Sequence, residues 1–122
     1  MNYSRLSALV DHLPVGVLLL DSRGYIVVAN ATIYSIFGYS QPELVGTNAS
    51  RLMAASPAAM IHWYRAMIAR RGLLLSTPLP MRARDGTVKM IDCTLSNLLD
   101  RESIAGVLFI IYPLKDPEII KK

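Results

Sequence analysis

The chain has 122 residues, of which 52% are hydrophobic and 18% are charged, and its formal net charge is +4. This composition is too apolar for a disordered chain, and the length suits one domain with a single core. The lone cysteine excludes an internal disulfide and a cysteine-rich metal site. No basic stripe interleaved with aromatics indicates nucleic-acid binding. The longest apolar stretch, residues 104–114, is too short for a membrane-spanning helix, and the first residues lack the pattern of a secretory signal. We therefore expect a soluble, cytoplasmic chain without membrane insertion.

The first predicted element is a short amphipathic helix within residues 1–12. Residues 4–12 have helical spacing, which places an apolar stripe on one side. The stripe consists of Leu6, Leu9, Val10 and Leu13. It must pack against this chain's own sheet or against a partner. His12 follows the stripe, and we expect it at the surface.

Two strands and a tight turn come next. Residues 15–20 form a short apolar run bounded by turn residues, which is typical of a buried strand. Residues 21–24 (Asp-Ser-Arg-Gly) supply a turn in which Gly24 is free to adopt a positive φ. Residues 25–29 are apolar and β-branched, and we predict that they return as a second strand.

Short helices follow the hairpin. Asn30 precedes the predicted helix 31–37, and an Asn side chain there can accept a hydrogen bond from a free N–H of the first turn. Gly38 ends that helix. Ser40 and Glu43 have the spacing of a capping box, which begins the next helix.

The second half of the chain contains one longer helix and three strands. Ser56 and Pro57 are a strong helix start, and we predict the helix to about residue 71, after a helical turn over 47–53. Residues 73–84 form a strand whose two prolines predict an irregular path or an edge position. A hairpin turn at Asp85-Gly86 leads to an alternating strand over residues 87–98.

The last predicted strand, residues 104–112, is apolar on both faces. One face carries Ile104, Leu108 and Ile110, and the other carries Val107, Phe109 and Ile111. Such a strand must be covered on both sides. We expect a homodimer to supply part of the cover, although the N-terminal helix alone is an alternative. The candidate interface residues are Leu6, Leu9, Val10, Val107, Phe109 and Ile111.

The order of these elements and several short words resemble the PAS domain family, the small sensor modules of signalling proteins. The resembling words are Leu13-Pro14-x-Gly16, Asp21-x-x-Gly24, Asn30-Ala31, Phe37-Gly38-Tyr39-Ser40, Pro42-Glu43-Leu44-Val45-Gly46 and Arg84-Asp85-Gly86-Thr87. The resemblance implies an α+β PAS fold over residues 13–114: a five-stranded antiparallel sheet with short helices and one longer helix on one face. The N-terminal helix precedes it, and residues 115–122 would begin a C-terminal connector. Tyr112-Pro113-Leu114 replaces the Asp-Ile-Thr triplet with which many members end.

In this family a cavity between the long helix and the inner face of the sheet holds haem, flavins, organic acids, lipids or nothing. Flavin photosensors carry a reactive Cys at the position of Ala49, so we expect no flavin–cysteinyl adduct. Haem-binding members use a His of the long helix, and His62 lies there. On a helical wheel, however, His62 lies opposite the apolar face, so haem binding and any metal site are not expected.

The apolar face of the long helix is the candidate wall of this cavity. Together with the facing strand and a rim, the candidate pocket residues are Phe37, Met53, Met60, Trp63, Tyr64, Met67, Ile91, Cys93 and Leu95. Core packing is the other interpretation of the same stripe. The lining suits an apolar or lipid-like ligand better than a dicarboxylate, which needs inward cations; only Arg71, at the end of the helix, is a candidate cation.

No enzyme motif is present, and two histidines leave little for a catalytic triad, so we expect no catalysis by this chain. We predict a sensory and dimerisation module that relays ligand or partner binding to a signalling effector by population shift. The alternatives are a ligand-free protein–protein dimerisation scaffold and a haem-based gas or redox sensor through His62.

Overall fold

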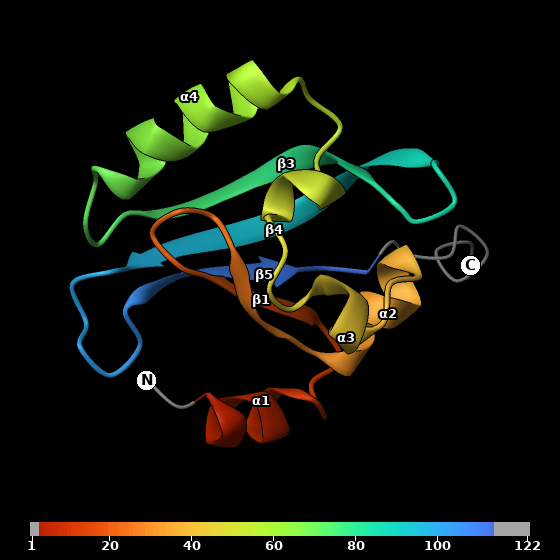
Figure 1. The fold of residues 1–122 in the computed structure, drawn as a ribbon, viewed down its shortest axis with the longest axis horizontal. Helices are drawn as coiled ribbons and strands as arrows, with labels where there is room; N and C mark the ends of the chain where they lie inside the picture. Colours follow the sequence, from red (N-terminus) through yellow and green to blue (C-terminus); the bar gives the residue numbers. More distant parts are fainter. Residues whose placement is uncertain (1–2, 114–122) are drawn as a thin grey trace, which may run out of the picture.

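We analysed a computed structural model of the protein, which describes residues 3–113 (Figure 1). The elements follow the order α1 (Ser4–Val10), β1 (Gly16–Leu20), β2 (Ile26–Ala29), α2 (Ala31–Phe37), α3 (Gln41–Leu44), the 3-10 helix η1 (Ala49–Leu52), α4 (Pro57–Ile68), β3 (Leu74–Arg82), β4 (Val88–Leu98) and β5 (Gly106–Ile111). The elements predicted within residues 3–113 are present, and the predicted α+β fold is confirmed. The predicted connector over residues 115–122 lies outside the described residues. Within residues 3–113, no helix has the length and hydropathy needed to cross a membrane.

The five strands form one antiparallel sheet in the order β2-β1-β5-β4-β3. The last strand in sequence therefore lies in the centre, and β3 lies at an edge. The edge position confirms what Pro78 and Pro80 predict, because proline cannot donate a hydrogen bond to a further strand. The segment after η1 covers part of this edge, since the Ala54 N–H donates to the Pro80 carbonyl at 3.0 Å.

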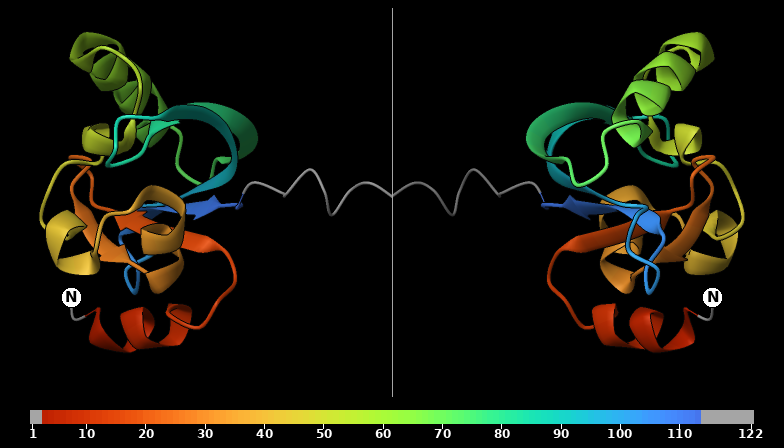
Figure 2. Two further views of the ribbon diagram at one scale, coloured as in Figure 1. Left: turned by 90° about the vertical axis from the view of Figure 1, so that its right-hand side faces the viewer. Right: turned by 90° about the vertical axis from the view of Figure 1, so that its left-hand side faces the viewer.

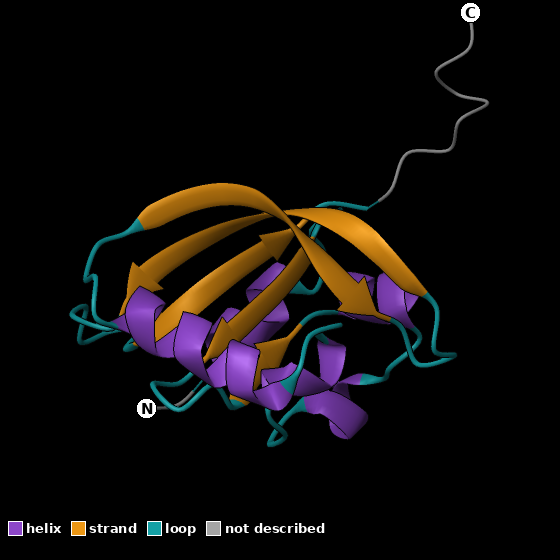
Figure 3. Cartoon of the chain, turned by 90° about the horizontal axis from the view of Figure 1, so that it is seen from above, coloured by secondary structure: helices purple, strands orange, loops and turns teal. Residues whose placement is uncertain are grey.

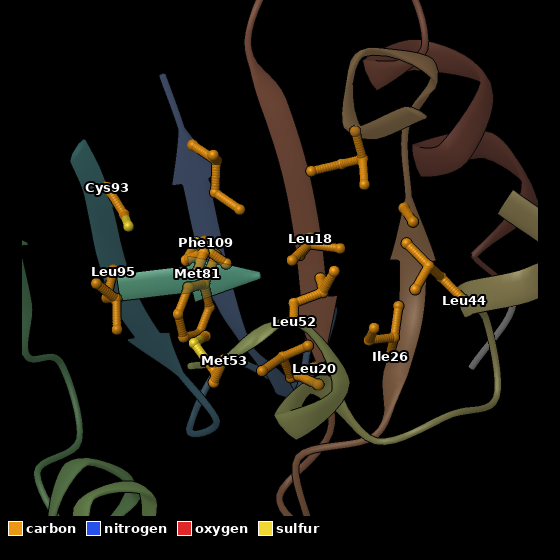
Figure 4. Close-up of a cluster of buried hydrophobic side chains, with 14 of the residues drawn as sticks. Leu18, Leu20, Ile26, Leu44, Leu52, Met53, Met81, Cys93, Leu95 and Phe109 are labelled. Carbon is orange, nitrogen blue, oxygen red and sulfur yellow. The ribbon is translucent and has the colours of Figure 1, made fainter. Parts of the chain in front are cut away.

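The inner face of the sheet carries the main core. Leu18 and Leu20 of β1 point to this face with Phe109 of β5, and side chains from α2, α3, η1 and α4 pack on them. Figure 4 shows these buried side chains converging from neighbouring strands, with Met53 and Met81 beside Phe109. The curved sheet and the helices on its concave side are seen in Figure 3.

The outer face of the sheet carries a smaller cluster that α1 covers. Val17 and Leu19 alternate with the core residues of β1 and pack with Val28 and Val10. Figure 2 shows α1 and α4 on opposite sides of the sheet. The cover that the sequence requires is therefore supplied in part by the N-terminal helix.

The predicted interface role of three β5 residues is wrong. Val107, Phe109 and Ile111 are at most 1% exposed and belong to the main core, so they cannot meet a second subunit. Leu108 and Ile110 occupy the outer face instead. Both faces of β5 are apolar, so the sequence does not show which face turns toward the main core. The register of β5 with β1 decides which face turns inward.

The predicted capping role of Asn30 is also wrong. Its side chain makes no cap hydrogen bond to α2. The Oδ1 atom accepts from Val17 N, and Nδ2 donates to the carbonyls of Val10 and Val15, each at 2.8 Å. Asp11 takes over at the helix start, where its Oδ1 accepts from Ala31 N at 2.9 Å. Asn30, fully buried, thus joins the end of α1 to the starts of β1 and α2.

Other local predictions are confirmed. Gly24 adopts φ +87 in the β1–β2 turn. Ser40 and Glu43 form a complete capping box: Ser40 Oγ accepts from Glu43 N, and Glu43 Oε1 accepts from Ser40 N at 3.0 Å. These features depend on residues a few positions apart, which is why the sequence predicts them.

Candidate functional site

A cavity of about 480 Å³ lies between α4 and the inner face of the sheet. That volume is in the usual range for small-molecule sites, roughly 300–1,000 Å³. Its lining comes from β1, the β1–β2 turn, η1, α4 and β5. The lining residues are Leu20, Ser22, Arg23, Gly24, Asn48, Ala49, Ser50, Met53, Pro57, Met60, Ile61, Trp63, Tyr64, Arg65, Ile68 and Phe109.

The cavity exists because α4 packs closely on the sheet only near its C-terminal end. Met67 is the one fully buried residue of α4. Beside it, Asn97 of β4 donates from Nδ2 to the carbonyls of Met67, Ile68 and Arg70 at 3.0 to 3.2 Å. These bonds satisfy carbonyls that a helix end leaves free. Towards its N-terminal end, α4 leaves Met60 and Trp63 half-buried over the cavity.

A second contact holds α4 across the mouth of the cavity. The Tyr64 hydroxyl donates to the carbonyl of Asp21 in the β1–β2 turn at 2.6 Å. Burial, and to a lesser degree the Asp21 carboxylate, raises the pKa of Tyr64. The phenol therefore stays protonated and remains a donor across the physiological pH range.

The third wall is η1, which is fixed to the same turn. Asn48 caps η1 by accepting from Ser50 N at 3.0 Å and donates from Nδ2 to the Arg23 carbonyl at 3.3 Å. The Ala49 N–H donates to the Gly24 carbonyl at 2.9 Å. The turn thus contacts both η1 and α4, and its position sets the width of the mouth.

The predicted pocket residues fall into three groups. Met53, Met60, Trp63 and Tyr64 line the cavity. Phe37 and Ile91 instead line a separate open hollow of about 390 Å³ between α2 and the β3–β4 hairpin. Met67, Cys93 and Leu95 are buried in the core and line neither space.

Cys93 is a packed core residue in this structure. It is 1% exposed, and its Sγ donates to the Ile91 carbonyl at 3.3 Å. Burial, followed by the nearby Asp92, raises the pKa of the thiol to about 11. The thiolate that nucleophilic chemistry requires is therefore scarce at neutral pH.

His62 is exposed, and it is not one of the cavity residues. The helical wheel predicts this orientation, which points an imidazole away from any group held inside. Nothing in the lining offers haem iron another histidine among the described residues. Arg71, the candidate cation from the sequence, is also exposed and outside the cavity.

Sequence reasoning missed two cations of the lining, Arg23 and Arg65, and one anchor, Asn97. Arg65 falls on the polar side of the helical wheel, and Arg23 belongs to a turn that reads as solvent-exposed. Only the meeting of that turn with α4 brings both arginines to one mouth. A signal for Asn97 was present: it extends the buried alternation of Ile91, Cys93 and Leu95 as a polar residue.

The geometry defines an α+β domain with a cavity between one helix and the inner face of an antiparallel sheet. The sequence model of the PAS fold matches residues 4–114. The chain therefore belongs to the PAS family, and the resemblance drawn from the sequence is confirmed.

Several solved structures share this fold at low sequence identity. A domain of a sensory box sensor histidine kinase/response regulator from Geobacter sulfurreducens is 24% identical, with a TM-score of 0.68, covering 88% of this chain and 90% of that one. The PAS domain of an HTR-like protein from Haloarcula marismortui is 20% identical, with a TM-score of 0.74 and coverages of 91% and 96%. A PAS domain of a LuxR-family transcriptional regulator from Burkholderia thailandensis, solved in complex with ethanol, is 21% identical, with a TM-score of 0.64 and coverages of 93% and 98%. Among curated proteins, no sequence matches the chain significantly.

Proposed function

We propose that this PAS domain, a sensory signalling module in general terms, binds a small, mainly apolar ligand in the cavity under α4 and passes the bound state to an effector in the cytoplasm through a homodimer. The observation that carries this proposal is the cavity itself, whose floor consists of Leu20, Met53 and Phe109. Any catalytic activity would belong to the effector.

The proposed relay is a population shift between two positions of α4. The Asn97 bonds hold the C-terminal end of α4, so the N-terminal end is the part that a ligand would displace. Movement there acts on the β1–β2 turn through the Tyr64–Asp21 bond. The turn continues into β1, whose outer residues Val17 and Leu19 contact α1. A ligand that binds one position of α4 more tightly would shift the equilibrium between the two positions, together with the turn, β1 and α1. The size of the shift is set by the difference in affinity for the two positions.

The proposed dimer surface is the outer face of the sheet that α1 leaves uncovered. Leu74 of β3 and Met90 of β4 are 70% and 58% exposed. Side chains alternate along β4, and Ile91, Cys93 and Leu95 are buried on the inner face, so Met90 points outward. Leu74 is paired with Ser96, which is on the same face as Met90, so Leu74 points outward as well. Leu9 of α1, 72% exposed, keeps its predicted interface role. A second subunit seated here would reach both α1 and β5.

Native mass spectrometry of the purified chain tests the ligand proposal. A retained ligand adds its mass to the polypeptide, and Ala49→Leu, which places bulk in the cavity, should abolish the added mass. Ala66→Leu is the matched control, since Ala66 is exposed on α4 and lies outside the lining. Ser50→Phe at the mouth is a second blocking variant should Ala49→Leu fail to fold. A bare polypeptide mass for every variant, with no uptake of added apolar compounds, would leave the ligand-free scaffold as the better account.

Sedimentation equilibrium tests the dimer proposal separately. Met90→Glu should weaken the dimer by roughly tenfold or more, because it buries an unpaired charge at the interface. Tyr34→Glu changes an equally exposed aromatic residue of α2 and should leave the dimer intact. Equal masses for both variants and the wild type would contradict the proposed surface.

A further inference from the structure

Two arginines lie at the mouth of the cavity without a carboxylate partner. Arg23 comes from the β1–β2 turn and Arg65 from α4. The one ion pair within residues 3–113 joins Arg84 to Glu43, and neither of these residues lines the cavity. Arg23 lies over the ring of Tyr25 at 5.2 Å, and within residues 3–113 its side chain makes no ion pair.

No other charged side chain among the described residues lines this cavity. Asp21, the nearest acid in sequence, is committed to its own turn, where Oδ1 accepts from the backbone N–H groups of Arg23 and Tyr25 at 2.9 and 3.0 Å. The Asp21 carboxylate is still close enough to act on Tyr64 of the lining, but it is one negative charge beside two arginines, so the mouth carries an excess of positive charge. Ser22 and Ser50 also line the space and add hydroxyl donors.

The interior has the opposite character. Leu20, Met53, Met60, Trp63 and Phe109 form an apolar floor and roof. Methionines adapt to irregular apolar ligands. A ligand that satisfies both regions has an apolar chain inside and one negative charge at the mouth.

We infer that the cavity binds a small amphiphile, an apolar chain that ends in a carboxylate, with the carboxylate held between Arg23 and Arg65. The planar guanidinium group matches a carboxylate in two-bond geometry. A dicarboxylate is disfavoured because its second charge would lie against the apolar floor. This inference rests on the proposed function, since it names the class of ligand for the same site.

Isothermal titration calorimetry with octanoate and octanamide tests the inference. The two probes share a chain and a shape and differ in charge. We expect octanoate to bind roughly tenfold tighter than octanamide, the advantage that a partly exposed charge-assisted hydrogen bond supports. Trp63, the only tryptophan of the chain, lines the cavity, and a change in its fluorescence on octanoate binding would place the probe there.

Arg23→Gln and Arg65→Gln should each weaken octanoate binding several-fold more than octanamide binding, and so reduce the preference for octanoate. Arg82→Gln removes the same charge from an exposed position outside the cavity and should keep the wild-type preference. Equal affinities for the two probes in the wild type would overturn the inference and leave the proposed function standing. Binding of neither probe would count against both. A preference lost equally in all three variants would indicate attraction by net charge and would likewise overturn the site.

Discussion

The buried Asn30 amide offers the sharpest test of how the chain is held together. All its polar atoms are used, with one bond accepted from Val17 N and two donated to the carbonyls of Val10 and Val15. Asn30→Asp keeps the size and the acceptor but removes both donors, and it turns oxygen lone pairs towards two buried carbonyls. The Val15 carbonyl is then left without a partner, which costs about 1–3 kcal/mol, while the Val10 carbonyl still accepts from Leu13 N at 3.1 Å. The buried carboxylate, which faces both carbonyl oxygens, adds the cost of an unpaired charge. We therefore expect a loss of about 3–5 kcal/mol of unfolding free energy, a large part of the roughly 5–15 kcal/mol of an ordinary domain.

Urea unfolding followed by circular dichroism measures this loss. The deficit should shrink as the pH falls, because burial raises the pKa of the new carboxyl and its protonated form can donate one of the missing bonds. Asn48→Asp is the control, since Asn48 is only half-buried and its carboxylate would still accept from Ser50 N. Its cost should stay below about 1 kcal/mol. Equal stabilities of the two variants would refute the role assigned to Asn30.

Three further predictions concern backbone strain, acid stability and the thiol. Ala105 has φ 52, so Ala105→Gly should raise the melting temperature by a few degrees, the left-handed strain being about 1 kcal/mol; a lower melting temperature would contradict this. The backbone N–H of Ser40 lowers the pKa of Glu43 below its ordinary value of 4.5; stability from this group is present above that value and lost as the pH falls, so Glu43→Gln should flatten the pH dependence of the melting temperature below about pH 4.5. Cys93 should resist a disulfide reagent in the native chain and react once urea unfolds it, and fast native reaction would contradict its burial.

The sequence predicted the elements because their signals are local. Ser56 and Pro57 begin α4, and Gly24 makes the first turn, with partners only a few residues away. The same reasoning could not orient β5, whose two faces are equally apolar, nor find the true partners of Asn30, up to 20 residues distant. Contacts between residues far apart in the chain decide both, and such contacts produce no periodic pattern in the sequence.

The sequence predicted one of the two facing walls of the candidate site. The stripe of α4 is correct, since Met60, Trp63 and Tyr64 line the cavity. The predicted facing wall, Ile91, Cys93 and Leu95, lies on β4, one strand away from the strand that lines the cavity. Asn97 closes the gap beside β4, and the cavity opens over Phe109 of β5 instead. The position of α4 over the sheet thus depends on one buried amide, and a pattern of hydrophobic residues does not predict the contacts of an amide.

The proposed function requires that the space under α4 accepts a small ligand. Two-dimensional NMR of the labelled chain with a set of small apolar fragments measures this at the cavity itself. We expect binding fragments to shift the signals of Met53, Met60, Trp63 and Phe109, while exposed Tyr34 of α2, which belongs to neither the cavity nor the proposed dimer surface, stays unchanged. Shifts confined to the outer face, or no shifts with any fragment, would contradict it.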